Sequence, residues 1–585
     1  MHTFTVWAPK SSAVTVKTGD GMYPMSRWLR DSRPGWWKVE VERATDGTDY
    51  AFLLNNDPHA YPDPRSCWQP NGVHAPSRIV DHSLFKWSDQ TWQATPLLDA
   101  IIYELHLGTF TPEGTCDAAI TRLAYLRELG ITHIELMPVA AFTGKRGWGY
   151  DGVALFAPND AYGGPDALKR VVDACHTHGL AVLLDVVYNH FGPVGNYTGK
   201  FGPYIIESHS TPWGGAVNLD EAGSMEVRRF YCDNALSWLR DYHFDGLRLD
   251  AVQTFVDRSA THFLEQLSQE VECLSAQAVK PFVLIAESDL NDPRIITPCS
   301  VDGCGAGGYG MDAQWSDDFH HALFAVLTGE RNGYYADFGL LSQLAKALSS
   351  AFVYDGGYSQ YREHNHGRPI GNLPGHRFLG YIQNHDQVGN RAQGDRLHPM
   401  VSLGSAKVAA ALVMTAPFVP MIFQGEEFAA STPFQYFCDY EDPAVAKSVS
   451  DGRHRECIAL GWDPKDVPDP QDPATFERSK LKWNESTTGH HAEMLNWYQK
   501  LIRLRRGNPS LTDGDLHNTQ VQFDEQAKWL RMRRGGCEVV CNLSHEEIIF
   551  HVASSAHILL TSSDQIMLIG TELTLPAESV AILSL

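Results

Sequence analysis

Four acidic residues of this chain lie at the C-terminal ends of predicted strands: Asp185, Asp250, Glu287 and Asp386. A charged side chain beside buried strands is costly unless it is paired or used in chemistry. A structural ion pair explains any one of them equally well, but four at one edge of a sheet favour chemistry. Two carboxyl groups, one protonated and one ionised, can together cleave the bond between two sugars.

The residues around these carboxyl groups indicate separate roles. Side chains alternate along a strand, so Arg248 and Asp250 point to the same side, where the guanidinium favours the ionised carboxylate of a nucleophile. Glu287 follows the apolar residues 282–286. Burial there raises its pKa, as a proton donor at neutral pH requires. Three further polar residues are expected to bind sugar hydroxyls: Asp386, His190 and His385.

The carboxyl groups are positioned by strands that alternate with helices. The expected strands are 101–107, 133–138, 181–188, 244–250, 281–287, 311–315, 377–384 and 419–425. One expected helix covers residues 117–130, with a stripe of Ile120, Leu123, Leu126 and Leu129 and a stop at Gly130. Apolar strands alternating with helices predict parallel pairing, and eight such units predict a closed (β/α)8 barrel. The acidic residues then end strands three, four, five and seven, where such a barrel builds its active site.

Two smaller β regions flank the barrel. Residues 1–95 contain short alternating runs separated by turn residues and predict a β-sandwich of immunoglobulin-like type. Residues 508–585 predict a C-terminal all-β domain, which leaves 96–507 for the catalytic barrel. Two insertions follow predicted strand ends, a short one at 191–224 after strand three and another at 426–487 after strand eight.

The net charge is −23, from 47 Lys and Arg residues against 70 Asp and Glu residues. This charge repels a nucleic acid or an anionic membrane surface but leaves a neutral sugar unaffected. We therefore expect a small-molecule oligosaccharide partner, no nucleic acid and no membrane. The sequence makes no prediction of the oligomeric state.

Eleven cysteines occur without a C-x-x-C pair. Cys175, Cys232 and Cys273 fall in predicted helices, which predicts buried, reduced thiols. The chain starts directly with a strand pattern, and no apolar run approaches about 18 residues, so we expect a cytoplasmic protein without a signal peptide or a transmembrane helix. No Cys/His cluster has zinc spacing and no phosphate-binding G-x-x-x-x-G-K-[ST] loop is present, so we expect no cofactor.

The motifs that carry these residues resemble the α-amylase family of glycoside hydrolases. DVVYNH, GLRLDAV, IAES and IQNHD look like the four signature regions of that family, in the same order and on the same strands. The resemblance implies that Asp250 is the nucleophile, that Glu287 is the general acid/base, and that Asp386 binds and distorts the sugar at the cleaved bond. It implies supporting roles for four more residues: Asp185, His190, Arg248 and His385.

Longer stretches resemble one branch of that family, the maltooligosyltrehalose trehalohydrolases. They include YELHLGTFTPEGT, RGWGYDGV, SDDFHHALFAVLTGE and FQGEEFAASTPFQYFCDY, and the resemblance covers nearly the whole chain. It implies further substrate-binding residues: Trp148, Tyr150, Trp213, Asp318 and His321. Core packing is the alternative explanation for the aromatic ones. Many α-amylases bind calcium at the strand-three insertion, but here that insertion is short and poor in acidic residues, so we expect no metal.

The resemblance implies hydrolysis of the α-1,4 bond next to the terminal trehalose of maltooligosyltrehalose, which releases trehalose and a maltooligosaccharide. We expect retention of the anomeric configuration, for which the two carboxyl groups must lie about 5–5.5 Å apart. Two alternatives stay open: an α-1,4-glucan branching enzyme, which uses the same three carboxylates, and a glucan-binding scaffold without catalysis.

Overall fold

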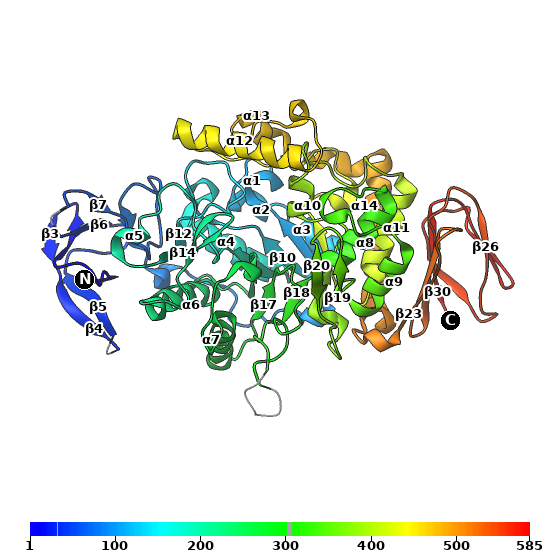
Figure 1. The fold of residues 1–585 in the computed structure, drawn as a ribbon, viewed down its shortest axis with the longest axis horizontal. Coiled ribbons are helices and arrows are strands. Elements are labelled where there is room, and N and C mark those ends of the chain that lie inside the picture. Colours follow the sequence, from blue (N-terminus) through cyan, green and yellow to red (C-terminus); the bar gives the residue numbers. More distant parts are fainter. Residues whose placement is uncertain (32, 56, 301–306) are drawn as a thin grey trace.

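The computed structural model describes residues 1–31, 33–55, 57–300 and 307–585. The molecule is elongated, with N-terminal strands at one end, a barrel in the middle and C-terminal strands at the other end (Figure 1). The predicted fold class, a barrel flanked by two all-β parts, is therefore confirmed. The boundaries 1–95, 96–507 and 508–585 stay our proposal for the domains.

Eight parallel strands close into a barrel, because the last strand, β22, pairs with the first, β9. Their bounds are β9 Ile102–Leu105, β10 His133–Leu136, β13 Ala181–Val186, β16 Gly246–Leu249, β17 Val283–Ala286, β18 Ala313–Trp315, β21 Phe378–Gly380 and β22 Val419–Phe423. Each of the eight predicted strands contains one of these, which confirms the prediction.

Alternate residues of each strand fill the inside of the barrel. An apolar floor includes Ile102, Leu183, Ile285, Trp315 and Met421, all fully buried. Two residues further along a strand, the same side carries a charged layer: Glu104, Asp185, Arg248 and Glu287. The period of two along a strand therefore places these charged side chains on the inner side of the barrel, beyond the apolar residues and toward the C-terminal mouth.

Helices surround the barrel (Figure 1). Their bounds are α1 Leu107–Phe110, α2 Cys116–Ile120, α3 Leu123–Leu129, α4 Gly164–Thr177, α6 Ser224–Asp241, α7 Phe263–Ala278, α8 Asp317–Thr328, α9 Leu341–Ser350, α11 Leu403–Thr415, α14 Gly489–Gly507 and α15 Pro509–Thr512. The hairpin β11 Ala140–Ala141 with β12 Ala154–Pro158 and the hairpin β19 Asp355–Ser359 with β20 His364–Gly367 lie between them.

The helix predicted over residues 117–130 is divided into α2 and α3. The Thr121 hydroxyl donates to the carbonyl of Ala118 at 2.7 Å, and the N–H of Arg122 bonds to the carbonyl of Ala119 rather than one residue earlier. This tighter turn interrupts the helix, because the threonine side chain competes for a backbone acceptor. Gly130 ends α3 with a φ of 102°, as predicted.

The N-terminal strands form two sheets, as expected of a sandwich. Their orders are β1-β5-β4 and β3-β2-β6-β7, with β8 paired to β6. The bounds are β1 His2–Trp7, β2 Val14–Thr18, β3 Gly21–Pro24, β4 Ser26–Arg30, β5 Arg33–Val41, β6 Asp49–Leu54, β7 Ala60–Tyr61 and β8 Ser77–Arg78. The residues of β3 and β4 are half-buried or exposed and give no clear apolar alternation.

The C-terminal strands also form two sheets, with orders β23-β24-β25-β30-β27 and β26-β29-β28. The bounds are β23 Thr519–Asp524, β24 Trp529–Arg534, β25 Cys537–Asn542, β26 Ile548–His551, β27 His557–Thr561, β28 Met567–Ile569, β29 Glu572–Leu575 and β30 Ser579–Ser584.

The two insertions contain structure of their own. Residues 191–224 hold α5 Thr198–Phe201 and the hairpin of β14 Ile205–Thr211 with β15 Gly214–Val217. Residues 426–487 hold α12 Pro443–Ala459 and α13 Pro473–Arg478. Figure 1 shows α12 and α13, in yellow, along one side of the barrel, away from both β domains.

The described cysteines are free thiols. Cys175 and Cys232 are buried as predicted, but Cys273 on α7 is exposed. The buried stripe of α7 is formed by Leu264, Leu267 and Val271, and a residue two positions past Val271 lies on another face of the helix. Cys304 lies outside the described residues. No helix in the described part of the chain is long and apolar enough to cross a membrane.

Two buried arginines hold the backbone that leads into β22. Arg505 of α14 donates to the carbonyls of Met414, Ala416 and Phe418 at 2.7–3.0 Å. Arg534 of β24 donates to the carbonyls of Thr415, Ala416 and Leu511 at 2.7–3.0 Å. Both the last barrel helix and the C-terminal domain therefore anchor the start of the eighth strand.

Arg534→Gln should destabilise the protein, because a shorter neutral side chain leaves buried carbonyls without donors. We expect a loss of about 2–3 kcal/mol or more, and a lower melting temperature by circular dichroism. Arg533→Gln, on the exposed side of the same strand, is the control and should change stability by less than about 0.5 kcal/mol. Equal melting temperatures for the two variants would contradict this anchoring role.

Candidate active site

The fully buried side chain of Arg248 lies at the centre of the charged layer. Its Nη1 atom donates to Asp185 Oδ2 at 2.6 Å and to Asp250 Oδ1 at 2.9 Å, and its Nη2 atom lies 2.7 Å from Glu287 Oε2. The guanidinium also lies 4.1 Å from the ring centre of Trp315. Burial lowers the pKa of Arg248, but the carboxylates, Asp185 first, outweigh burial and raise the pKa well above its ordinary value.

Asp250, the predicted nucleophile, lies directly after β16 and is held from two sides. The amide Nδ2 of Asn189 donates to Asp250 Oδ2 at 2.7 Å and to the Asp250 carbonyl at 2.8 Å. The other carboxylate oxygen accepts from Arg248. Both oxygens therefore have a fixed direction, as a positioned nucleophile requires.

Glu287, the predicted proton donor, lies directly after β17. Its Oε2 atom accepts from the N–H of Ala251 at 2.8 Å. Ala251 has a φ of 41°, in the left-handed region that residues with a Cβ rarely adopt. Burial raises the pKa of Glu287 well above its ordinary value, and Asp250 adds to this, while Arg248 opposes it. The carboxyl group is therefore suited to carry a proton at neutral pH.

Asp386 belongs to the short helix α10, His385–Gly389, which the side chain of Asn384 caps. The N–H of Asp386 donates to Asn384 Oδ1 at 2.9 Å, and Asp386 Oδ1 accepts from Asn390 Nδ2 at 2.7 Å. Burial raises the pKa of Asp386 above its ordinary value, and the charges of His385 and then Arg248 limit this increase. The cap and the amide fix this third carboxyl group on the rim of the barrel.

Tyr150 joins two other predicted residues. Its hydroxyl donates to Asp185 Oδ2 at 2.6 Å and lies 2.7 Å from His385 Nε2. Its ring also stacks on the imidazole of His385, with centres 5.2 Å apart. Asp185, Tyr150 and His385 therefore form one hydrogen-bonded row beside Arg248.

His190 and Trp213 lie against each other, with ring centres 4.7 Å apart and planes 14° from parallel. His190 is hydrogen bonded to Asn189, which connects it to the support of Asp250. Burial lowers the pKa of His190, with the charge of Asp250 opposing this. Trp213, in the turn of the β14–β15 hairpin, stays 48% exposed, so part of its ring is available to a ligand.

A cavity of about 660 Å³ brings the predicted residues together. Those that line it are Trp148, Tyr150, His190, Trp213, Asp250, Glu287, His385 and Asp386. Asp185 and Arg248 lie among the buried supports of these side chains. Another part of the wall comes from α12, through Val449, Gly452, Arg453 and Glu456. The size and the mixture of aromatic and polar lining suit a ligand of several sugar rings.

Asp318 and His321 of α8 are not among the residues that line this cavity. Asp318 Oδ2 accepts from the N–H groups of Val353 and Tyr354 at 2.6 and 2.8 Å, which fixes a buried turn. The ring of His321 stacks on Tyr334, with centres 4.9 Å apart. The structure gives both residues packing roles, and their contact with substrate stays a prediction.

Sequence reasoning did not single out four residues that support the site. Glu104 contacts His385, Asn189 holds Asp250, Trp315 lies against Arg248, and Asn390 holds Asp386. Glu104 gave a usable signal, because it is a carboxylate inside an otherwise apolar strand, like the four acidic residues that were identified. The other three are polar or aromatic residues whose partners are distant in sequence.

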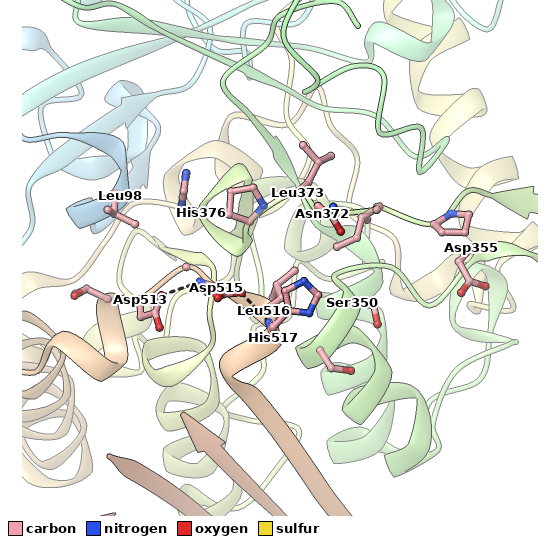
Figure 2. Close-up of a pocket in the computed structure, with 17 residues that line it drawn as sticks. Leu98, Ser350, Asp355, Asn372, Leu373, His376, Asp513, Asp515, Leu516 and His517 are labelled. Carbon is pink, nitrogen blue, oxygen red and sulfur yellow. Dashed lines mark hydrogen bonds between the residues drawn. The ribbon is translucent and has the colours of Figure 1, made fainter. Parts of the chain in front are cut away.

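A second cavity, of about 740 Å³, lies near the N-terminal ends of the barrel strands, away from the C-terminal mouth. Figure 2 shows Leu98 and His376, which precede β9 and β21, facing the segment with Asp513 and Asp515. Asp513 Oδ1 accepts from the N–H of Asp515, and Asp515 Oδ1 accepts from the N–H of His517, both at 2.9 Å. These carboxylates cap turns, so the catalytic arrangement belongs to the first cavity.

Arg248→Lys should remove most of the activity. One ammonium group cannot contact three carboxylates in the geometry that the planar guanidinium provides. We expect at least about a hundredfold loss in kcat/KM with an unchanged circular dichroism spectrum. Arg258→Lys, at an ion pair whose arginine is mostly exposed, is the control and should keep its activity. Full activity of Arg248→Lys would show that the shared guanidinium is dispensable.

Residues 78–202 match the family model described as "Alpha amylase, catalytic domain". A solved structure of a putative alpha amylase from Salmonella typhimurium superposes with a TM-score of 0.89 at 36% identity, over 100% of this chain and 97% of that chain. A 1,4-alpha-glucan branching enzyme from Shewanella baltica is 30% identical over 54% of this chain and 48% of its own length.

Two relatives match over almost their whole lengths. A malto-oligosyltrehalose trehalohydrolase from Rhizobium sp. (strain M-11) is 47% identical over 99% of this chain and 97% of its own. The protein of the same name from Saccharolobus solfataricus is 44% identical over 92% of this chain and 90% of its own. This chain therefore belongs to the malto-oligosyltrehalose trehalohydrolases, within the alpha-amylase family of glycoside hydrolases.

Proposed function

We propose that this protein hydrolyses the α-1,4-glucosidic bond next to the terminal trehalose of maltooligosyltrehalose and releases trehalose. The observation that carries the proposal is the contact of Arg248 with both Asp250 and Glu287 in a chain that matches trehalohydrolases over nearly its full length. The branching enzyme matches only about half of the chain, which favours hydrolysis over glucan transfer.

The reaction has two steps. Glu287 gives its proton to the oxygen of the scissile bond while Asp250 attacks C1, so that trehalose leaves and a glycosyl-enzyme ester forms. Glu287, now ionised, takes a proton from a water molecule as the water oxygen attacks C1. The ester bond to Asp250 breaks, which frees the Asp250 carboxylate and the maltooligosaccharide. Retention is supported by the way that Asp250 and Glu287 contact the same guanidinium, which keeps the two carboxyl groups close.

The remaining residues of the cavity bind the sugar on the non-reducing side of the bond. Asp386, as a carboxylate, accepts hydrogen bonds from sugar hydroxyls, and His190 presents Nε2, the ring nitrogen that is not bonded to Asn189. Both ring nitrogens of His385 are hydrogen bonded to protein groups, so His385 supports the sugar site through Tyr150 and Asp386 rather than by binding a sugar hydroxyl itself. Tyr150, Trp148 and Trp213 offer aromatic faces, on which sugar rings pack. Their positions in one cavity with Asp250 support these roles.

The partner is a small oligosaccharide, and no metal or cofactor takes part in the proposed steps. Net charge favours a neutral ligand over nucleic acid or an anionic membrane. We place the protein in the cytoplasm, because its described cysteines are free thiols, as in reducing compartments.

Substrate preference tests the proposed activity. The purified protein is incubated with maltopentaosyltrehalose or with uncapped maltoheptaose, and products are separated by chromatography. We expect rapid release of trehalose from the capped glucan and little glucose or maltose from the uncapped one. Equal hydrolysis of both would leave a general α-glucan hydrolase, and a shift in iodine staining of amylose without small products would indicate a branching enzyme.

The roles of the two carboxyl groups can be separated with a maltotriosyl fluoride, because fluoride leaves without a proton. Glu287→Gln should lose at least about a thousandfold in kcat on the capped glucan but still release fluoride, whereas Asp250→Asn should fail with both. In the wild type, kcat/KM should fall as the pH rises through the raised pKa of Glu287, since the donor must be protonated. Fluoride release by Asp250→Asn at the wild-type rate would show that Asp250 is not the nucleophile.

Proton NMR during the reaction tests retention. Trehalose has no reducing end, so the only new reducing-end signal comes from the maltooligosaccharide product. We expect the α-anomer first, followed by slow mutarotation. A β-anomer as the initial product would exclude the two-step mechanism.

A further inference from the structure

The carboxylate of Glu104 is buried inside the barrel and both of its oxygens contact one residue, His385. Its Oε2 atom accepts from the backbone N–H of His385 at 2.9 Å, and its Oε1 atom is hydrogen bonded to His385 Nδ1. β9 and the start of α10 are distant in sequence, and β22 lies between β9 and β21 in the barrel, so this pair connects the first barrel strand to the loop after the seventh.

The hydrogen bonds around Tyr150 determine the protonation of the His385 ring. Asp185 Oδ2 accepts from both Arg248 Nη1 and the Tyr150 hydroxyl, each at 2.6 Å. The single hydroxyl hydrogen of Tyr150 is donated to Asp185, so in the contact of 2.7 Å with His385 the Tyr150 oxygen accepts and Nε2 donates. Since Nδ1 donates to Glu104, both ring nitrogens carry hydrogen and the imidazole is positively charged.

The charges that face this ring come from several elements. Glu104 of β9 and Asp386 of α10 are acidic neighbours, and Arg248 of β16 and His106, directly after β9, are basic ones. Burial lowers the pKa of His385, but Glu104 and then Asp386 outweigh burial, so the pKa is raised. The positive ring in turn lowers the pKa of Asp386, an effect larger than the opposing one from Glu104 itself.

We propose that Glu104 is a positioning residue of the active site, which holds His385 as a charged double donor and so orients Tyr150 and keeps Asp386 ionised. The inference rests on the proposed function, because it assigns the use of His385 and Asp386 to that reaction. Glu104 itself does not line the cavity and acts through His385.

Glu104→Gln tests the proposal, with Glu135→Gln as the matched control. Glu135 is the register neighbour of Glu104 on β10 and is equally buried, but its carboxyl oxygens have no hydrogen-bond partner among the described residues. Burial raises the pKa of Glu135 well above its ordinary value, so glutamine replaces an already neutral group. Glu135→Gln should keep the wild-type kcat/KM and its pH profile.

Glutamine at position 104 has only one side-chain oxygen for the two donors of His385, its backbone N–H and its Nδ1 atom. The neutral amide also no longer stabilises a positive charge, so the His385 ring becomes neutral. We expect kcat/KM for the capped glucan to fall about ten- to a hundredfold. The acid limb of the profile should move to higher pH, because Asp386 loses the cation that keeps it ionised. Glu104→Asp retains the carboxylate and should lose less activity and keep the wild-type acid limb.

A double-mutant cycle with His385→Gln completes the test. If Glu104 acts through His385, the double variant is no less active than His385→Gln alone. Additive losses, an unmoved acid limb in Glu104→Gln, or a lower activity of Glu104→Asp than of Glu104→Gln would each overturn the proposal. The wild type in the same assay distinguishes failure of the Glu104 proposal from failure of the proposed function. The proposed function fails only if the wild type itself releases no trehalose.

Discussion

The site depends on one buried cation among several carboxyl groups. Arg248 has no access to water and contacts Asp185, Asp250 and Glu287 at once. Burying such a charge is strongly unfavourable, and only close, well-directed partners offset it. The buried carboxylates likewise need the guanidinium, because its positive charge offsets the cost of burying their negative charge. Strand alternation meets both needs by placing these side chains on the inner side of the barrel, between the apolar floor and the C-terminal mouth.

The proposed catalytic groups and the outer wall of the cavity come from different parts of the chain. The barrel strands supply the proposed acid, the proposed nucleophile and their supports, whereas the two insertions supply Trp213 and the α12 wall of the cavity. Arg453 of α12 connects the two parts, because it donates to the carbonyls of Gly389 and Arg391 at 2.8 and 3.0 Å, at the end of the helix that carries Asp386. A change in the insertion can therefore reach the catalytic carboxylate through the backbone of α10.

The barrel and its carboxyl groups were predictable because apolar strands and their charged ends leave a local pattern in the sequence. Eight strands and the residues around Asp250 and Glu287 followed from it. Features that depend on a distant partner did not follow. The break at Thr121 comes from one side-chain hydrogen bond, and the proposed role of Glu104 requires the fold that brings β9 to His385. Asp318 and His321 pack against residues 334 and 353–354, which the sequence pattern did not connect to them.

The clamp on the start of β22 has a consequence for biosynthesis. Arg534 lies far beyond the last barrel strand, yet it holds the carbonyls of Thr415 and Ala416 that lead into that strand. While the chain emerges from the ribosome, the barrel can pair its strands in order, but the segment before β22 lacks half of its anchors until β24 has been made. Closure against β9 is then completed late, and the ribosome-bound chain passes through an open barrel whose apolar floor is exposed to chaperones.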